Sequence, residues 1–494
     1  MGQGLPGEKE VMTGEMSDTI NMRLLALEAL LEIEREGKQS HWVIRDYLEK
    51  YQYLPRQDRA FFTRLCQGTL EYRIQLDYIL DSFSKVPARK MKPVLREILR
   101  MAIYQMKYMD SVPDSAAVNE AVKLAQKKGF HQLKGFVNGV LRTAARRLQE
   151  VEYPSREADP VRYLAVTYSM PDWLILPWQK QFGFEATETI CKAFLQPSPL
   201  TVRIRPAADQ TTDPACHPGV RQTTDSAAYG TPLSSEENFE EVLDSLRSQG
   251  VTPKKAPYLD YAWELSGYDS LQELDAFGQG RIQAQDVSSM LAVEAAGIRP
   301  GDRVLDLCAA PGGKSLLSAD KVGQAGQVEA RDLTSYKVGL IEENIERCGL
   351  TNITARLADA RKYDQSRRAW ADVVLADLPC SGYGVIGRKP DIKYKASPDR
   401  QKALAQLQRE ILTNAVTYVK PGGTLLYSTC TLSQEENLDN VRWLLSRFPF
   451  RLDSLVPYLC PQLQGGTAPQ GYLQLLPGLQ ACDGFFIARL VKKE

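Results

Sequence analysis

The chain has 494 residues, of which 43% are hydrophobic and 25% are charged. These proportions are typical of a globular protein, and the length predicts two to four domains rather than a single core. The 61 basic and 61 acidic residues cancel, so the net charge identifies no partner.

The first residues, MGQGLPGEKEVMTGEMSD, lack the basic and apolar regions of a secretory signal. No run reaches the roughly 18 apolar residues of a membrane span. Nine cysteines and three histidines are scattered without a CxxC pair, which argues against a zinc site and a disulfide framework. Cys216-His217 suggests a metal, but no second pair supports it. We expect a cytoplasmic protein with no metal and no membrane partner, with residues 1–17 as a disordered tail.

Residues 18–150 show helical periodicity throughout. In NMRLLALEALLEIEREG, Leu24, Leu27 and Leu31 recur at helical spacing before a stop at Gly37. Similar segments follow without strand-like alternation, which predicts an all-α domain. Within residues 51–150, 18 Lys and Arg stand against 9 Asp and Glu. This bias suits nucleic acid binding, and a solvated helical face explains it equally well.

Residues 160–285 have a mixed pattern. TVRIRP (201–206) alternates like a strand, EENFEEVLDSLRSQG is an amphipathic helix, and APYLDYAWELSG reads as extended. We expect a small α+β domain here. Its residues 207–233 are rich in Pro, Gly and Thr, which predicts a long loop insertion.

From about residue 286 to the end, strands, loops and helices alternate. The segments are DRVLDLCAAPGGKSLLSADKV, GQVEARDLTSYKVGLIEENIERCG, ADVVLADLPC, RQKALAQLQREILTNAVTYVKPGG and GTLLYSTCTL. Such alternation predicts a doubly wound, mainly parallel α/β sheet. Ligands of these sheets bind beyond the carboxyl ends of the strands.

The glycine turn DLCAAPGGKS (306–315) follows one of these strands and opens a helix. Gly312 and Gly313 let the backbone approach a ligand, and the helix N-terminus offers free N–H groups. The turn matches neither the dinucleotide nor the Walker pattern, which gives a phosphate loop little support. Lys314 is either a ligand or a solvated residue at the helix start, with equal weight.

Acidic residues end three consecutive strands: Asp332, Asp359 and Asp377. Each alone is more often a strand-end cap or turn former. Asp332, 20 residues after Gly312, suits a ribose diol, and Asp359 suits an adenine amino group. Three acidic strand ends together predict a cofactor that carries a nucleoside.

Two cysteines follow neighbouring strands, Cys380 in DLPCSGYG and Cys430 in STCTL. Adjacent strand ends lie about 5 Å apart, so these thiols can share a pocket. A single cysteine is by default a buried structural residue, but two beside Asp377 favour chemistry. A thiolate that adds to carbon 6 of cytosine makes carbon 5 nucleophilic toward a methyl donor, and a carboxyl group at N3 and the exocyclic amine stabilises the charge. The residues alone do not rank the two thiols.

CAAPGGK, DLPCSGYG and STCTL together resemble the RNA cytosine-5 methyltransferases of the Nol1/Nop2/Sun family. DSVPDSAAVNEAVKLAQKKG and KGFVNGVLR resemble a NusB-type RNA-binding domain, and the combination resembles the bacterial members that act on 16S rRNA. GRIQAQDVSSMLA (280–292) and DGFFIARL also match, so the resemblance covers nearly the whole chain. It implies a NusB-like helical domain (18–150), an α+β RNA-binding and linking domain (160–285), and a Rossmann-like methyltransferase domain that uses S-adenosylmethionine (286–494).

The resemblance also implies roles for the site residues. The methionine part of S-adenosylmethionine would lie on Cys308, Ala309, Ala310, Pro311, Gly312, Gly313 and Lys314. Asp332 would bind the ribose and Asp359 the adenine side, and Asp377 would lie near both the methyl donor and the target base. Cys430 would be the nucleophile, while Cys380 would assist product release. Leu378 stands where the family usually has Ala, which would slightly reshape the pocket wall.

The implied reaction is methylation of carbon 5 of a cytidine in 16S rRNA, or in a small-subunit assembly intermediate, by a monomer. The basic N-terminal half and the middle domain are expected to grip phosphates. In GRKPDIKYK (387–395), Arg388, Lys389, Lys393 and Lys395 form either a rim for the RNA backbone or a solvated loop.

Three alternatives remain. The same chemistry on tRNA is the nearest, because the family includes both substrates. An amino-group methyltransferase fits the DLPC loop poorly and leaves Cys430 idle. An RNA-binding factor with an inactive methyltransferase domain conflicts with the intact glycine loop, acidic positions and cysteines.

Overall fold

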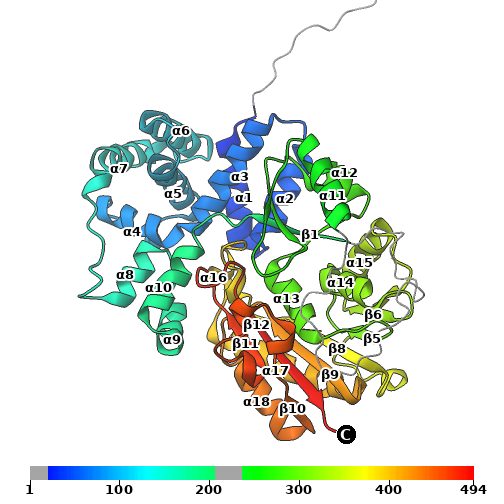
Figure 1. Cartoon of the computed structure of the whole chain (residues 1–494). Coiled ribbons are helices and arrows are strands. Elements are labelled where there is room, and N and C mark those ends of the chain that lie inside the picture. Colours follow the sequence, from blue (N-terminus) through cyan, green and yellow to red (C-terminus); the bar gives the residue numbers. More distant parts are fainter. Residues whose placement is uncertain (1–19, 206–235) are drawn as a thin grey trace, which may run out of the picture. The chain divides into compact units, whose positions relative to one another are not determined.

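The computed structural model describes residues 20–205 and 236–494. The expected tail at 1–17, the loop insertion at 207–233 and the pair Cys216-His217 lie outside the described residues. The chain divides into two units, residues 1–152 and 153–494 (Figure 1).

The first unit is entirely helical where it is described. Its α-helices are α1 (Met22–Glu36), α2 (Ser40–Lys50), α3 (Arg56–Glu71), α4 (Arg73–Phe83), α5 (Pro93–Tyr108), α6 (Asp114–Lys127) and α7 (Lys134–Arg147), with 3-10 turns η1 (Ala88–Lys90), η2 (His131–Leu133) and η3 (Leu148–Glu150). The Asn21 side chain accepts from Leu24 N and caps α1, which ends at Gly37 with φ +66°. The helical fold predicted for this region is confirmed.

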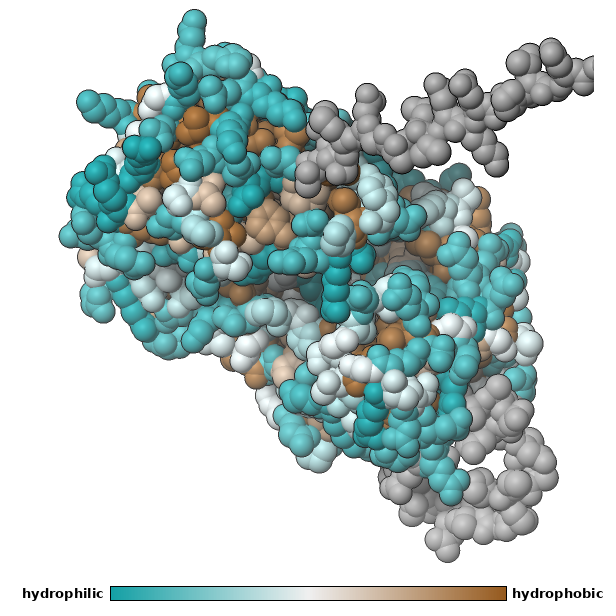
Figure 2. Space-filling model, turned by 90° about the horizontal axis from the view of Figure 1, so that it is seen from above, coloured by the Kyte–Doolittle hydropathy of each residue, from teal (hydrophilic) through white to brown (hydrophobic). Residues whose placement is uncertain are grey.

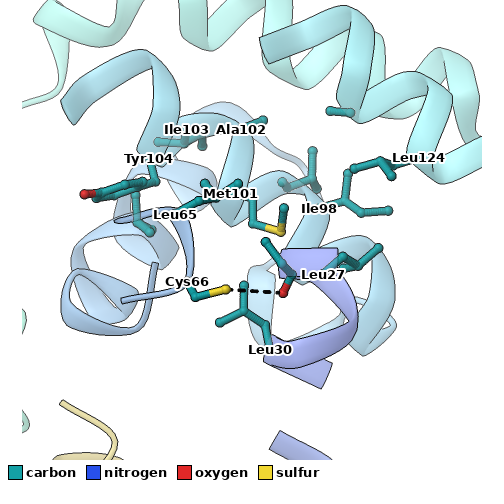
Figure 3. Packing of buried hydrophobic residues seen from close by; sticks show 14 of the residues in the cluster. Leu27, Leu30, Leu65, Cys66, Ile98, Met101, Ala102, Ile103, Tyr104 and Leu124 are labelled. Atoms are coloured by element: carbon teal, nitrogen blue, oxygen red, sulfur yellow. Dashed lines mark hydrogen bonds between the residues drawn. The ribbon is translucent and has the colours of Figure 1, made fainter. Parts of the chain in front are cut away.

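The core of this unit forms around α5. Its residues Ile98, Met101, Ala102 and Tyr104 pack against Leu27 and Leu30 of α1, Leu65 and Cys66 of α3 and Leu124 of α6 (Figure 3). The Cys66 thiol lies 3.9 Å from the carbonyl oxygen of Ala26 and is fully buried, and burial raises its pKa. Cys66 is therefore a structural thiol.

The second unit begins with three helices and a small antiparallel sheet. The helices are α8 (Pro160–Thr167), α9 (Asp172–Phe182) and α10 (Phe184–Ala193). The sheet has the order β2 (Thr252–Lys255), β3 (Ala262–Ser266), β1 (Leu200–Ile204), β4 (Ile282–Ala284), with α11 (Glu236–Ser248), η6 (Leu271–Glu273) and α12 (Asp275–Gly278) packed nearby. The strand and the helix expected near 201 and 236 both form.

The rest of this unit is built on an eight-stranded sheet. The order is β10 (Phe450–Leu452), β12 (Phe485–Lys492), β9 (Val419–Thr429), β8 (Ala371–Asp377), β5 (Arg303–Asp306), β6 (Gln327–Asp332), β7 (Ile353–Leu357), and β11 (Tyr472–Leu475) pairs with β12. Strands β5 to β9 are parallel, whereas β10, β11 and β12 pair antiparallel. The predicted α/β fold is confirmed, and its C-terminal strands form an antiparallel edge.

Helices cover both faces of this sheet. They are α13 (Val287–Ala296), α14 (Gly313–Val322), α15 (Ser335–Arg347), the short α16 (Ile392–Lys395), α17 (Pro398–Tyr418) and α18 (Leu438–Arg447), with 3-10 turns η7 (Gln365–Arg367), η8 (Tyr383–Val385), η9 (Val456–Tyr458), η10 (Pro461–Leu463) and η11 (Ala468–Gln470). Val304 of β5 packs with α13 and α14, whereas its neighbour Leu305 packs with α17 and α18. Because successive side chains of a strand point to opposite faces, β5 is buried on both sides.

The surface agrees with this burial of apolar side chains. On the face drawn in Figure 2, hydrophilic residues dominate and hydrophobic ones show only in small areas. Within residues 20–205 and 236–494, no helix has the length and apolar content needed to cross a membrane.

A buried ion cluster fixes the small sheet to helix α14. Arg203 Nη1 and Arg205 Nη2 lie 2.5 and 2.9 Å from the two carboxylate oxygens of Asp320. Arg205 Nη1 also donates to the carbonyl oxygens of Gly280 and Cys348. Burial opposes ionisation of Asp320, but the two guanidinium groups outweigh it and lower its pKa.

Replacing Asp320 by Ala is expected to destabilise the second unit strongly. Two buried guanidinium groups would lose their counter-charge, which costs about 3–5 kcal/mol of unfolding free energy when a buried pair is broken. Urea denaturation measures the loss. Asp244→Ala, which removes an exposed carboxylate 2.7 Å from Arg247, is the matched control and should hardly move the urea midpoint. Equal midpoints for the two variants would contradict this role of Asp320.

Candidate active site

The candidate site lies at the carboxyl edge of the large sheet, where β5, β6, β8 and β9 end. The structure brings Lys314, Asp377, Cys380 and Cys430 together there. Asp332 lies at the same edge, beside the glycine loop.

The glycine loop connects β5 to α14. Ala309 N donates to Arg331 O (2.8 Å), and Gly312 N donates to Ala309 O (2.7 Å). Gly312 has φ +109°, a conformation that favours glycine, and it directly precedes α14. The first-turn N–H groups of the helix lack partners within the helix and are available to a bound anion or dipole.

Asp332 ties this loop to the end of β6. One carboxylate oxygen accepts from Ala310 N (3.0 Å), and the other accepts from Leu333 N (2.7 Å) and Lys337 Nζ (3.0 Å). A carboxylate has about four acceptor positions, so Asp332 retains capacity for a further donor.

Large apolar side chains are exposed beside these acids. Leu333, Tyr336 and Leu357 are each more than half exposed, and they follow or end β6 and β7. Asp359, two residues beyond β7, accepts from the backbone N–H and guanidinium of Arg361, and the guanidinium hydrogen bond lowers its pKa. An apolar surface next to two carboxylates suits a flat, polar-edged ring.

Lys314 is not a solvated residue at the helix start. Its side chain is only 13% exposed, and its Nζ lies 2.7 Å from Asp377 Oδ2. The other oxygen of Asp377 accepts from Ser428 Oγ (2.9 Å). Burial disfavours the ammonium, but Asp377 and Asp306 outweigh this effect and raise the pKa of Lys314. A permanent positive charge therefore lies beside Asp377 and Cys430.

The two thiols form a close pair. Cys380 Sγ and Cys430 Sγ are 3.3 Å apart, and both cysteines are free. The hydrogen bond with Cys430 raises the pKa of Cys380 well above its ordinary value, and burial and the nearby carboxylates of Glu436 and Asp377 add to the effect. The two thiols thus share one hydrogen bond, in which either sulfur can be the donor.

A buried polar network holds the loop of Cys380 from both sides. Gln408 Nε2 donates to Pro379 O (2.9 Å) and to Glu436 Oε2 (3.0 Å). Ser381 N donates to the same Glu436 oxygen (2.9 Å). Gln408 and Glu436 are both fully buried, and burial raises the pKa of Glu436. The backbone on each side of Cys380 is thus fixed.

Sequence reasoning missed Gln408 and Glu436. Gln408 has a detectable signal, because it lies on the apolar face of α17 that also carries Ile411 and Ala415. A carboxamide at such a position needs buried partners. Glu436, in contrast, lies in a polar run after Cys430 that reads as an ordinary loop.

The expected RNA rim at 387–395 is wrong for Lys393, and two of its other cations are already ion-paired within the chain. Lys393 is buried and donates to Ser169 O (2.7 Å). Arg388 pairs with Asp483 and Asp286, and Lys395 pairs with Asp391. Arg388 and Lys393 bind partners from distant parts of the chain, whereas Lys395 binds within its own segment. A solvated loop is equally excluded for Lys393.

Two further observations bear on the site's chemistry. Among the described residues, His, Cys, Asp and Glu form no group of three that could hold a metal ion.

Gly384 N donates to Cys430 O (2.9 Å), and Gly484 N donates to Gly384 O (2.9 Å). The loop of Cys380, the end of β9 and the start of β12 therefore meet at Gly384 and Gly484, which have no side chains.

The chain matches known proteins over most of its length. Its residues 295–491 match the family described as 16S rRNA methyltransferase RsmB/F, and residues 20–146 match the NusB family. A Bacillus subtilis protein named "Probable ribosomal RNA small subunit methyltransferase B" is 37% identical over 477 residues, covering 96% of this chain and 99% of that protein.

Two other comparisons agree. Ribosomal RNA small subunit methyltransferase B of Cronobacter sakazakii is 30% identical over 486 residues, covering 97% of this chain and 100% of that protein. The crystal structure of PH0851 has a TM-score of 0.72 at 24% identity, covering 95% of this chain and 99% of that one, so the fold is shared.

Gly384→Ala is expected to destabilise the second unit. The added Cβ would lie 1.9 Å from Gly484 O and 2.9 Å from Cys430 O, and backbone atoms cannot move aside cheaply. Overpacking of this kind costs about 1–3 kcal/mol, measurable by urea denaturation. Gly465→Ala is the control, because its Cβ would meet nothing within 4 Å. A Gly384→Ala protein as stable as this control would show that the contact is not tight.

Proposed function

The chain belongs to the RsmB/F family of 16S rRNA methyltransferases, and we propose that it methylates carbon 5 of a cytidine in 16S rRNA. The methyl donor is S-adenosylmethionine, and Cys430 forms a transient bond to carbon 6 of the base. The observation that carries this proposal is the pair of thiols 3.3 Å apart, beside an ammonium–carboxylate pair. Methyl transfer to an amino group would leave both thiols without a task, since a nitrogen lone pair needs no added nucleophile.

S-adenosylmethionine, when bound, supplies an electrophilic methyl group. The chemistry of the residues fits it: the glycine loop Cys308–Lys314 offers N–H groups to its methionine part, and Asp332 has acceptor capacity for ribose hydroxyls. Leu333, Tyr336 and Leu357 are exposed beside Asp332 and Asp359, and an adenine ring would cover this apolar surface. Asp359 accepts a hydrogen bond from the adenine amino group.

Cys430 begins the reaction by attacking carbon 6. The deprotonated sulfur is the nucleophilic form, and the Lys314 ammonium interacts electrostatically with Cys430. As the sulfur–carbon bond forms, the electrons of the C5–C6 double bond move so that carbon 5 becomes nucleophilic. The Asp377 carboxylate accepts a hydrogen bond from the exocyclic amine of the cytosine, and Lys314 keeps a positive charge nearby while the ring gains electron density.

Cys380 acts in the second half of the reaction. After methyl transfer, the proton on carbon 5 must leave and the bond between Cys430 and carbon 6 must break. The hydrogen bond with Cys430 is the main reason that the pKa of Cys380 is raised. When the C5–H bond breaks, its proton passes to water, its electrons re-form the C5–C6 double bond, and the Cys430 sulfur leaves carbon 6 with the electrons of the sulfur–carbon bond. Cys380, whose sulfur lies 3.3 Å from that of Cys430, assists this release by donating a hydrogen bond to the departing thiolate.

The substrate requires an accessible base. Carbons 5 and 6 of a stacked cytosine cannot reach a buried thiol, so the cytidine is unpaired or flipped out. We propose 16S rRNA or a small-subunit assembly intermediate as the partner, bound by a monomer in the reducing cytoplasm. The NusB-like first unit and the small α+β sheet contribute RNA binding.

Single cysteine variants test this proposal on deproteinised 16S rRNA with methyl-labelled S-adenosylmethionine. Cys430→Ala should lower methyl transfer by at least about 1,000-fold, because the covalent nucleophile is lost. Cys380→Ala should accumulate a protein–RNA adduct on denaturing gels. Nuclease mapping locates the label at a cytidine, and Cys348→Ala, which removes a thiol outside the site, is the matched control.

Each outcome of this experiment has a distinct meaning. Normal methylation by Cys430→Ala would refute the covalent mechanism. Label in tRNA but not in 16S rRNA would support the proposed reaction and show that the substrate is tRNA rather than 16S rRNA.

A further inference from the structure

A groove of about 440 Å³ opens between α9 and the loops that follow both candidate catalytic cysteines. Trp173 and Lys180 line it from α9, Tyr383 from the loop of Cys380, and Leu432 and Gln434 from the loop of Cys430.

The groove is close to the thiols along both loops. Because a chain extends at most about 3.6 Å per residue, the Cα of Leu432 lies within about 7 Å of that of Cys430, and the Cα of Tyr383 within about 11 Å of that of Cys380. Its ligand would therefore be a neighbour of the reacting base.

The groove also opens at the edge of the sheet that carries the candidate active site. Helix α17 leads into β9 and helix α18 follows it, so both helices begin at the edge where β9 ends. Gln401 in the first turn of α17 and Asp439 in the first turn of α18 both line the groove. A nucleic acid strand that delivers a base to Cys430 must pass along this edge.

The lining is aromatic at its floor. Tyr383 is 2% exposed, and its hydroxyl lies within reach of the Ser381 side chain. Its ring meets the half-buried ring of Trp173 edge to face, with centroids 5.8 Å apart. Because Tyr383 is buried, Trp173 is the ring of this pair that a ligand can reach.

The rim is made of acceptors of N–H groups and carries little positive charge. The exposed Glu435 carboxylate accepts from Gln401 Nε2 (3.2 Å), and Gln434 Nε2 lies 3.4 Å from Asp439 Oδ1. Among the residues that line the groove Lys180 is the one cation, and Asp439 also pairs with Arg442 (3.3 Å). The exposed Glu435 carboxylate suits the amino group of a nucleobase.

We propose that this groove binds an unstacked nucleobase, bearing an exocyclic amino group, from the nucleotide next to the target cytidine. The inference rests on the proposed function and adds a second base-binding site to it. Extruding the cytidine leaves its neighbour without a stacking partner, which costs free energy. The half-buried Trp173 replaces the lost stacking, as aromatic side chains do in single-stranded RNA recognition.

The test compares protein and RNA variants in one cycle. A 16S rRNA fragment with the target cytidine is prepared intact and with an abasic site at the 5′ or the 3′ neighbour, and Kd is measured by fluorescence anisotropy. Trp173→Ala should weaken binding of the intact fragment by about 5- to 160-fold, the range for one base–aromatic stack. One abasic fragment should show the same loss with the unaltered protein, and combining the two changes should add nothing.

Two further variants guard against misfolding and non-specific loss. Leu176→Ala removes an exposed apolar side chain of the same helix that does not line the groove, and it should leave Kd unchanged. Glu435→Gln, at an exposed position, should weaken binding only when the neighbouring base carries an amino group.

Several results would overturn the proposal. Additive losses from Trp173→Ala and an abasic neighbour would do so, as would full affinity for both abasic fragments. If Trp173→Ala bound RNA as tightly as the unaltered protein, the groove would not bind a base, and another class of partner, such as a basic peptide, would be its ligand. Measuring Kd requires no turnover. A fragment that binds but is never methylated would therefore refute the proposed function, while its Kd values would still test whether the groove binds a base.

Discussion

The parallel pairing of β8 with β9 is the constraint on which the site depends. Their register places Asp377 opposite Ser428, so the loops that carry Cys380 and Cys430 leave the sheet side by side. The 3.3 Å between the sulfurs follows from this alignment. A shift by one residue would turn every side chain of one strand to the other face and separate the thiols. Burial of β8 and β9 in the core excludes such a shift.

Around this pair, the chain arranges charges that would be unfavourable singly. Lys314, Asp377 and Asp306 are partly or fully removed from water, and each compensates another. Burial raises the pKa of Asp306 to about 6, while Ser315 Oγ donates to it (2.6 Å). The site thus keeps a positive charge where a thiolate and an electron-rich ring must form. The cluster of Arg203, Arg205 and Asp320 uses the same compensation to hold the small sheet.

The sequence reveals the parts of the site that depend on local pattern. Strand periodicity predicts where β6 and β8 end, and hence the positions of Asp332 and Asp377 at one edge. It also predicts that the two cysteines are neighbours. Long-range partners leave no such pattern: Lys393 reads as one of several cations in a basic segment, yet it is buried against Ser169. The hydrogen bond from Ser381 N to Glu436 and the groove beside α9 likewise cannot be predicted from the sequence, because their residues are far apart in the chain.

The most direct test of the account is to identify the residue that bonds to the base. RNA with 5-fluorocytidine at the target position accepts the nucleophile, but its fluorine cannot leave as a proton does, so the adduct persists. Digestion and tandem mass spectrometry then locate the RNA-modified peptide. The account predicts attachment at Cys430. Attachment at Cys380, or a turnover-competent enzyme that forms no adduct, would contradict it.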